Sequence, residues 1–246
     1  MNLEGKTAIV TGAGSGFGAG IAQVFAREGA TVMVADINAD AARTVAKQIG
    51  GIAQVVDVAD GASVSAMTRA AMDAWGRIDI LVNNAGITHM PAPMEEVTED
   101  DFDRVLAVNA KSVYLTAREI VPVMKQQRAG AILNVASTAG LSPRPRLNWY
   151  NASKGWMITA TKTMAVELAP DGVRVNALAP VAGETPLLAS FMGQDTPEMR
   201  AKFLSTIPLG RFSQPADMGE AAAFLCSDAA SMITGAVLEV DGGRCI

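Results

Sequence analysis

The stretch that decides the fold is Thr7-Ala-Ile-Val-Thr-Gly-Ala-Gly-Ser-Gly-Phe-Gly-Ala-Gly-Ile-Ala-Gln-Val-Phe25. A short apolar run comes first, five glycines follow from Gly12 to Gly20, and Ile21, Val24 and Phe25 then recur at helical spacing. This order predicts a strand, a tight turn and a helix. Because backbone N–H groups of such a turn can approach a pyrophosphate at the start of the helix, the stretch also predicts a nucleotide site. The uncharged residues from 7 to 26 do not predict a membrane span, since the glycines divide them.

Short apolar runs alternate with helical patterns along the rest of the chain, which predicts a seven-stranded sheet. The expected strands are Thr7 to Val10, Thr31 to Ala35, Ala53 to Val56, Ile78 to Val82, Ala131 to Ala136, Val173 to Leu178 and Ala236 to Val240. Apolar strands separated by helices are typical of a parallel sheet covered on both faces. The predicted fold class is therefore α/β, a Rossmann-like doubly wound sheet in one domain over residues 1–246.

Composition narrows the possible functions. Half of the 246 residues are apolar, and 20 basic against 25 acidic residues give a formal net charge of −5, which disfavours nucleic acid as a partner. The two cysteines, Cys226 and Cys245, lie in no metal-binding or disulfide pattern, so we expect no metal and a reducing cytoplasmic compartment. The first six residues do not resemble a secretory signal, and no membrane association is expected.

One long segment, residues 180–211, has no place in the strand and helix alternation. It is rich in Leu, Met, Phe and Pro, and we predict that it forms a substrate lid, because ligands of such folds bind beyond the carboxyl ends of the strands. A helical hairpin on the surface is the alternative. Within the segment, Leu187, Leu188, Phe191 and Met192 would present an apolar face to a pocket, and Met192 and Met199 are candidate pocket residues.

Asp36 ends the second expected strand, eighteen residues beyond Gly18. A carboxylate in that place can accept hydrogen bonds from both ribose hydroxyls of an adenosine, whereas a 2′-phosphate would meet it without a nearby cation, because Ser15 and Ile37 occupy the neighbouring places. The predicted cofactor is therefore NAD rather than NADP. The alternative role of Asp36 is to cap the helix expected from Asn38 to Ile49.

A phenol and an ammonium lie one helical turn apart in Tyr150-Asn-Ala-Ser-Lys154. A free phenol titrates near pH 10, and a neighbouring cation lowers that pKa, so the pair is suited to proton transfer. Ser137 follows the fifth expected strand and could bring a hydroxyl to the same crevice.

Together these motifs resemble the classical short-chain dehydrogenase/reductase (SDR) family. The resemblance extends from Lys6 to Gly243 and rests on the turn Thr11 to Gly18, Asp57-Val58, Asn83-Asn-Ala-Gly86, Asn109, Ser137, the Tyr150 and Lys154 pair, and Pro180 to Thr185. The last motif departs from the family pattern, because Val181 replaces its glycine.

The resemblance implies a role for each matched residue. Tyr150 would be the general acid/base, Ser137 would bind the substrate oxygen, Lys154 would hold the nicotinamide ribose and lower the pKa of Tyr150, and Asn109 would fix a water in a proton relay. The implied cofactor-binding residues are Gly12, Ser15, Gly16, Phe17, Gly18, Asp36, Asp57, Val58, Asn84, Tyr150, Lys154, Gly183 and Thr185. The family also implies a homotetramer.

The predicted function is the NAD-dependent interconversion of a secondary alcohol and a ketone in a small molecule. The chain is also similar to 3-oxoacyl carrier-protein reductases, but Ala131 and Asp171 stand where those enzymes commonly have basic docking residues, and only Arg128 remains. A nucleotide sensor that has lost catalysis is a third possibility. Arg144 and Arg146 could attract an anionic substrate or be solvated, and His89 could line the substrate site or lie in a surface loop.

Overall fold

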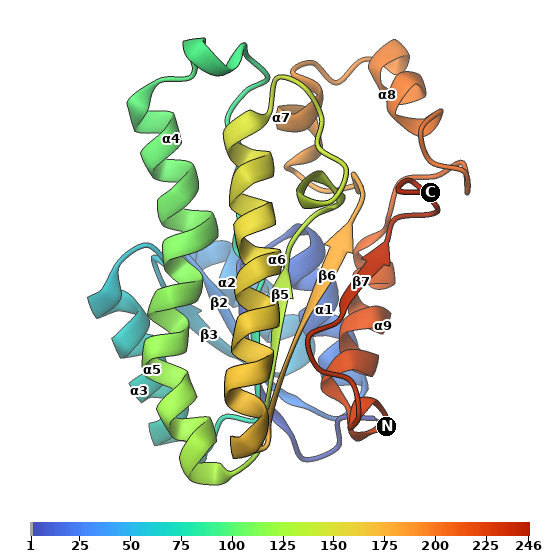
Figure 1. Ribbon diagram of the computed structural model, residues 1–246. Helices are drawn as coiled ribbons and strands as arrows, with labels where there is room; N and C mark the ends of the chain where they lie inside the picture. Colours follow the sequence, from blue (N-terminus) through green and yellow to red (C-terminus); the bar gives the residue numbers. More distant parts are fainter. Residues whose placement is uncertain (1) are drawn as a thin grey trace.

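The computed structural model describes residues 2–246 and shows a central sheet with helices on both faces (Figure 1). All seven strands pair in parallel in the order β3-β2-β1-β4-β5-β6-β7. The strands are β1 (Thr7–Thr11), β2 (Thr31–Asp36), β3 (Ile52–Val55), β4 (Ile80–Asn83), β5 (Gly130–Val135), β6 (Val173–Pro180) and β7 (Val237–Val240). Each of the seven predicted strands is present, and the predicted fold class is confirmed.

Nine α-helices accompany the strands within the described residues. They are α1 (Gly16–Arg27), α2 (Ala39–Ile49), α3 (Gly61–Trp75), α4 (Glu99–Leu106), α5 (Ser112–Gln127), α6 (Asn148–Leu168), α7 (Leu188–Met192), α8 (Pro197–Leu204) and α9 (Pro215–Cys226). Asn38 caps α2 by accepting hydrogen bonds from the N–H groups of Asp40 and Ala41. Asp36 is therefore not the cap of this helix, and the alternative role for it is wrong.

Two apolar clusters hold the layers together, one on each face of the sheet. On one face, α1, α2 and α9 pack on the strands through residues such as Phe25, Val45 and Ala222. On the other face, α3, α5 and α6 do so through residues such as Met67 and Ile120. Both sides of β1 are buried, because Val10 belongs to the first cluster and Ile9 to the second, as expected for a doubly wound sheet.

The segment from 180 to 211 forms part of a separate cap above the carboxyl ends of the strands, and it contains α7 and α8 (Figure 1). Its own apolar cluster contains Val181, Leu188, Met192, Ile207 and Phe212. Pro180, the first residue of the segment, still belongs to β6, which is two residues longer than predicted.

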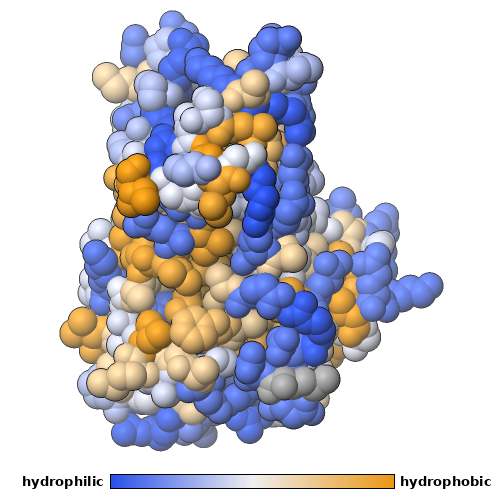
Figure 2. All heavy atoms as spheres, turned by 90° about the vertical axis from the view of Figure 1, so that its right-hand side faces the viewer, coloured by the Kyte–Doolittle hydropathy of each residue, from blue (hydrophilic) through white to orange (hydrophobic). Residues whose placement is uncertain are grey.

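β7 forms one edge of the sheet, and the face that carries β7 and α9 shows a band of apolar side chains (Figure 2). Leu238 of β7, Phe224 of α9 and Met232 are among the exposed large apolar residues. None of the helices between residues 2 and 246 is both long and apolar enough to cross a membrane.

Candidate active site

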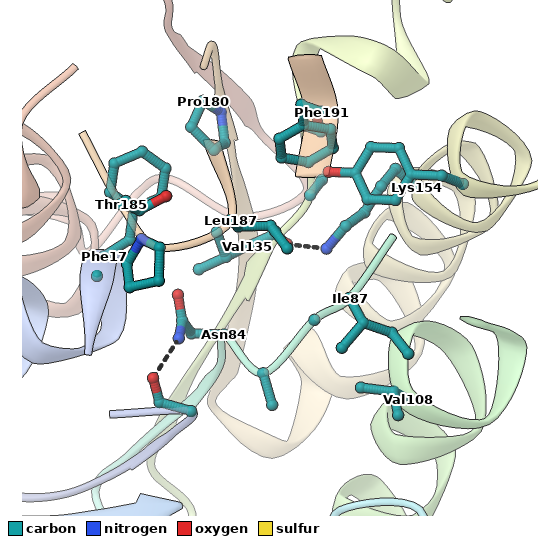
Figure 3. A pocket seen from close by; sticks show the side chains of 18 of the residues that line it. Phe17, Asn84, Ile87, Val108, Val135, Lys154, Pro180, Thr185, Leu187 and Phe191 are labelled. Carbon is teal, nitrogen blue, oxygen red and sulfur yellow. Dashed lines mark hydrogen bonds between the residues drawn. The ribbon is translucent and has the colours of Figure 1, made fainter. Parts of the chain in front are cut away.

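A cavity of about 700 Å³ lies at the carboxyl ends of the strands, beneath the cap. Its lining extends from Asp36 and the glycine turn to Tyr150 and Lys154. Figure 3 shows Phe17, Lys154 and the cap residue Phe191 among the residues that line it. The predicted site residues that line it are Gly12, Ser15, Gly16, Phe17, Asp36, Asp57, Val58, Asn84, Ser137, Tyr150, Lys154, Gly183 and Thr185. Of the catalytic and cofactor-binding residues that the family resemblance implies, Gly18 and Asn109 are the two that do not line the cavity.

The turn after β1 requires glycine for two different reasons. Gly12 and Gly16 adopt positive φ angles of 63° and 54°, which favour a residue without a Cβ atom. At Gly18 the reason is close packing, since a Cβ there would lie 2.2 Å from the carbonyl oxygen of Gly12. Gly18 therefore packs against the backbone of the turn and does not line the cavity.

Asp36 is fixed by two backbone N–H groups. Its Oδ2 accepts a hydrogen bond of 2.8 Å from Gly14, and its Oδ1 accepts one of 2.9 Å from Asn38. Ser15 and Ile37 also line this end of the cavity. The carboxylate thus lies beside the glycine turn, where the sequence predicts that the adenosine ribose binds.

Asn84, which follows β4, braces the same turn. Its Nδ2 donates to the carbonyl oxygens of Thr11 and Gly12 at 2.9 and 3.1 Å, and Figure 3 shows its side chain between β4 and the turn. The backbone N–H groups of Asn84 and Ala85 in turn donate to Oγ1 of Thr11. These bonds join the carboxyl ends of β1 and β4 across the floor of the cavity.

Tyr150, in the first turn of α6, is buried and lines the cavity together with Ser137. Its ring also meets the edge of the Phe191 ring of α7 at a centroid distance of 5.0 Å. Burial raises the pKa of Tyr150 to about 12, although the polar side chain of Ser137 opposes this increase. The phenol therefore keeps its proton at neutral pH.

Lys154 lies one turn along α6, with its Nζ 6.0 Å from the centroid of the Tyr150 ring. Nζ donates a hydrogen bond of 2.8 Å to the carbonyl oxygen of Val135 (Figure 3), and burial lowers the pKa of Lys154 to about 8. Burial therefore dominates the pKa of Tyr150 in this structure, and the lowering of that pKa by Lys154 stays a prediction.

Asn109 is fully buried in a short π-helical stretch, Ala107–Lys111, between α4 and α5. Its amide exchanges two hydrogen bonds of 2.9 Å with the backbone of Ile87 and donates a third to Oγ of Ser153. A Cβ added at Gly86 would lie 3.3 Å from Nζ of Lys154 and 3.4 Å from Oδ1 of Asn109, so both groups face that glycine. Asn109 thus holds the loop after β4 beside Lys154.

The start of the cap closes over the glycine turn. A Cβ at Gly183 would lie 2.3 Å from the Phe17 ring, and one at Gly16 would lie 3.2 Å from Thr185. Val181, which departs from the family pattern, is buried in the apolar cluster of the cap. The departure therefore contributes to the cap interior, and Val181 also lines the cavity together with Gly183 and Thr185.

Several other expectations need correction. His89 is neither in a surface loop nor in the cavity lining, because it is only 2% exposed and its Nδ1 bonds to the carbonyl oxygen of Met90. Leu188 and Met192 turn into the cap cluster, and Met199 packs against that cluster rather than lining the cavity. The cap contributes Leu187, Phe191 and Phe203 instead.

Arg144 lines the cavity, whereas Arg146 is exposed outside it. Analysis of the sequence also missed Leu147 and Phe203 as cavity residues. Leu147 directly precedes α6 and shares no family motif, so no signal in the sequence distinguishes it from a core residue. Phe203 is an isolated aromatic residue of α8, and its role depends on how the cap folds back over the sheet.

Comparisons with known proteins agree with this arrangement. A family model described as enoyl-(acyl carrier protein) reductase matches residues 12–244. The chain is 51% identical over 250 residues to 4-formylbenzenesulfonate dehydrogenase of Comamonas testosteroni, with 99% of each chain covered. It is 42% identical over 252 residues to a 3-oxoacyl-(acyl-carrier-protein) reductase of Thermotoga maritima, with both chains covered in full.

Solved structures are similar as well. A 3-ketoacyl-(acyl-carrier-protein) reductase of Brucella melitensis complexed with NADH matches with a TM-score of 0.95 and 51% identity, over 99% of this chain and 100% of that one. A xylitol dehydrogenase bound to NAD⁺ matches with a TM-score of 0.91 and 30% identity, over the same shares of the two chains.

The fold and the site define a nucleotide-dependent oxidoreductase of the Rossmann-like class. The chain belongs to the classical short-chain dehydrogenase/reductase family, and it is an enzyme of the alcohol and carbonyl chemistry that the family carries out.

Proposed function

We propose that this chain uses NAD to interconvert a secondary alcohol and a ketone in a free small molecule, with Tyr150 as the general acid/base. The observation that carries the proposal is that buried Tyr150 and Ser137 line the same cavity as the glycine turn and Asp36. The solved relatives complexed with NADH and NAD⁺ support the choice of cofactor.

The residues of the cavity fit a dinucleotide. The glycine turn would bind the pyrophosphate, and Asp36 would bind the adenosine ribose. Asp57 and Val58 would contact the adenine. At the other end, Asn84 and Lys154 would contact the ribose of the nicotinamide, and Gly183 and Thr185 would contact its carboxamide. NAD, when bound, supplies the carbon that accepts or donates the hydride. The protein supplies the position of the substrate oxygen and the proton.

Proton transfer follows from the geometry around Tyr150. In the direction of reduction, the Tyr150 hydroxyl donates its proton to the substrate carbonyl oxygen, while Ser137 donates a hydrogen bond to the same oxygen. The resulting phenolate is stabilised by the ammonium group of Lys154, whose Nζ lies 6.0 Å from the ring centroid. Asn109, which fixes the loop beside Lys154, would place the water through which Lys154 exchanges a proton with solvent.

The test is the variant Tyr150→Phe, with Tyr114→Phe as the control. Tyr114, the other tyrosine of the chain, is exposed on α5. We expect Tyr150→Phe to lower kcat by about 10²- to 10⁴-fold and to leave the Kd for NADH within a few-fold, while Tyr114→Phe keeps normal turnover. Retention of more than about a tenth of the wild-type kcat by Tyr150→Phe, a smaller loss than general acid/base catalysis gives, would refute the assigned role.

A carrier-protein thioester is the second candidate substrate, because two of the relatives are named as reductases of such thioesters. Against it, Arg128 and Lys125 both pair with Asp171, at 3.2 and 3.1 Å, at the amino ends of β5 and β6. Ala131 is buried in β5. These positions lie at the opposite end of the strands from the chain's own cavity. The relative named for 4-formylbenzenesulfonate supports a free substrate.

The two substrates are distinguished by kcat/KM for a 3-oxoacyl carrier protein and for a simple cyclic ketone, at low and high salt. We expect the free ketone to be preferred and the rates to depend weakly on salt. A preference for the carrier-bound thioester that falls steeply with salt would show that an acidic carrier docks by charge, and would favour the second candidate.

We also propose a homotetramer that acts in the cytoplasm. The support for assembly is the exposed edge strand β7 with Leu238, together with Tyr114 and Trp156, which line a shallow depression between α5 and α6. The support for a reducing compartment is that Cys226 and Cys245 are both free thiols. Light scattering of the purified protein would test the assembly.

A further inference from the structure

Arg144 carries a positive charge into the cavity without a negative partner. Its side chain lines the cavity and lies over the Phe203 ring of α8, with Cζ 4.4 Å from the ring centroid. The Asn151 amide fixes its backbone by donating a hydrogen bond of 2.7 Å to its carbonyl oxygen. Within residues 2–246, no aspartate or glutamate forms an ion pair with Arg144, and burial lowers the pKa of its guanidinium. A half-buried cation without a partner is unfavourable in the free protein.

A second guanidinium adds to this unfavourable charge. Arg244 belongs to the carboxyl-terminal segment, which packs under the end of the cap through a hydrogen bond from the N–H of Leu209 to the carbonyl oxygen of Gly242. The Nε of Arg244 is buried and has no hydrogen-bond partner. The positive charge of Arg244 is close enough to Arg144 to lower its pKa further.

The nearest acidic groups on the same segment are already engaged. The Asp241 carboxylate accepts hydrogen bonds of 2.8 Å from the N–H groups of Gly243 and Cys245. The Cys245 thiol stays neutral at physiological pH, because burial and the neighbouring carboxylates raise its pKa to about 11. In the cap, Arg200 holds the carboxylates of Glu184 and Asp195. Glu239, the other carboxylate of this segment, lies beside Asp241 and Cys245 and forms no ion pair with Arg144. The Arg144 guanidinium is thus left available for an anionic ligand.

We propose that Arg144, reinforced by Arg244, binds an oxyanion group of the substrate, a carboxylate or a sulfonate, carried on an apolar body that bears the reacting carbon. The apolar body would contact Leu147, Phe191 and Phe203, which line the cavity together with Tyr150. The inference rests on the proposed function, because it assigns the substrate class of the same cavity. An oxyanion beside Arg144 would supply the negative charge that its guanidinium lacks and would offset the repulsion from the charge of Arg244.

Arg146, two residues away, provides a matched control. It is exposed, does not line the cavity, and makes one long hydrogen bond of 3.4 Å to the carbonyl oxygen of Pro91. Replacing Arg146 changes the net charge of the protein by the same amount as replacing Arg144. A difference between the two variants therefore depends on where the charge is removed and not on the change in net charge.

The first experiment compares two substrates that differ only in charge, 4-acetylbenzoate and 4-acetylbenzamide. We expect Arg144→Met to lower kcat/KM for the benzoate about 10- to 100-fold and to leave kcat/KM for the benzamide within about 3-fold of the wild type. Arg144→Lys should keep part of the kcat/KM for the benzoate that Arg144→Met loses. Arg146→Met should change neither value. Arg244→Met should lower kcat/KM for the benzoate less than Arg144→Met does. An equal loss for both substrates would overturn the proposal, because Arg144 would then act only by holding Phe203 of the cap in place.

The second experiment measures binding and does not require turnover. Calorimetry with Tyr150→Phe and NADH should give a Kd for 4-acetylbenzoate that is at least 10-fold lower than that for 4-acetylbenzamide, and Arg144→Met added to this variant should remove the difference. Equal affinity for the two compounds would overturn the anion site, even if Tyr150→Phe behaves as the proposed function requires. Selective binding of the benzoate without turnover by the wild type would leave the anion site standing and refute the proposed function.

Discussion

The N–H of Gly14 donates a hydrogen bond of 2.8 Å to Oδ2 of Asp36. This bond joins the glycine turn after β1 to the carboxyl end of β2, so that the pyrophosphate end and the ribose end of the expected nucleotide site are held in a fixed relation. A Cβ at Gly14 would lie 2.9 Å from the same carboxylate oxygen. Glycine is therefore needed here for close approach rather than for an unusual φ angle.

Cofactor preference should depend on Asp36. We expect the wild type to prefer NAD and the double variant Asp36→Ala with Ser15→Arg to shift the preference toward NADP. The change removes a carboxylate that repels the 2′-phosphate and adds a guanidinium beside it. Values of kcat/KM for both cofactors measure the shift. A wild type that already prefers NADP would contradict the role given to Asp36.

The close packing behind the glycine turn predicts that Gly18→Ala is damaging. The added Cβ would lie 2.2 Å from the carbonyl oxygen of Gly12 and 2.4 Å from Nδ2 of Asn84. We expect Gly18→Ala to lower the free energy of unfolding by about 1–3 kcal/mol, as overpacking does, and to weaken NADH binding, because the turn must move. Chemical denaturation and NADH titration are the measurements.

The control for that experiment is Gly61→Ala in the first turn of α3. Its Cβ would meet only Cδ2 of Leu115, at 3.5 Å, and its φ lies outside the left-handed region. We expect this variant to be neutral or slightly more stable, since alanine favours helix. If the two variants behaved alike, the packing argument for Gly18 would fail.

The burial of Lys154 predicts how stability changes at alkaline pH. The folded chain has a pKa of about 8 for Lys154, against 10.5 without burial. Between pH 8 and 10 the unfolded chain therefore binds a proton that the folded chain does not, and the free energy of unfolding gains a contribution that rises with pH. Tyr150 acts in the opposite sense only above pH 10, where the unfolded phenol loses its proton first.

The variant Lys154→Met isolates this contribution. We expect its free energy of unfolding to rise less steeply with pH than that of the wild type between pH 8 and 9.5, by up to about 1.4 kcal/mol per pH unit. Lys162→Met, at an exposed position of the same helix, should leave the slope unchanged. Parallel slopes for the wild type and Lys154→Met would mean that Lys154 titrates as a solvated lysine.

Residues 180–211 should close over bound cofactor. Phe191 already meets the Tyr150 ring at 5.0 Å, and Thr185 lies against Gly16 of the glycine turn. We expect α7 and α8 to exchange their amide hydrogens more slowly when NAD is bound, because a filled cavity stabilises the closed cap. Peptides from β5 provide the internal reference, and equal protection of the cap with and without NAD would count against a lid.

The sequence by itself determined the features that depend on local periodicity or on a fixed spacing. The seven strands follow from runs of β-branched and apolar residues, and the turn from Gly12 to Gly18 follows from its place between a strand and a helix. Asp36 and the Tyr150 and Lys154 pair also reach the cavity as their spacing predicts. These features need no knowledge of distant contacts, because a parallel sheet brings the carboxyl ends of its strands to one edge.

Only the tertiary structure decided which side chains of the cap and of the loops reach the cavity. Met192 and Phe191 are neighbours in the chain, yet one fills the cap interior and the other meets Tyr150. Arg144 and Arg244 are one hundred residues apart, and the charge of Arg244 acts on Arg144 only because the carboxyl-terminal segment packs under the cap. The direction of the Tyr150 pKa shift could likewise not be predicted from the Tyr150 and Lys154 spacing. Burial raises this pKa, and the elements that bury the phenol are distant in the chain.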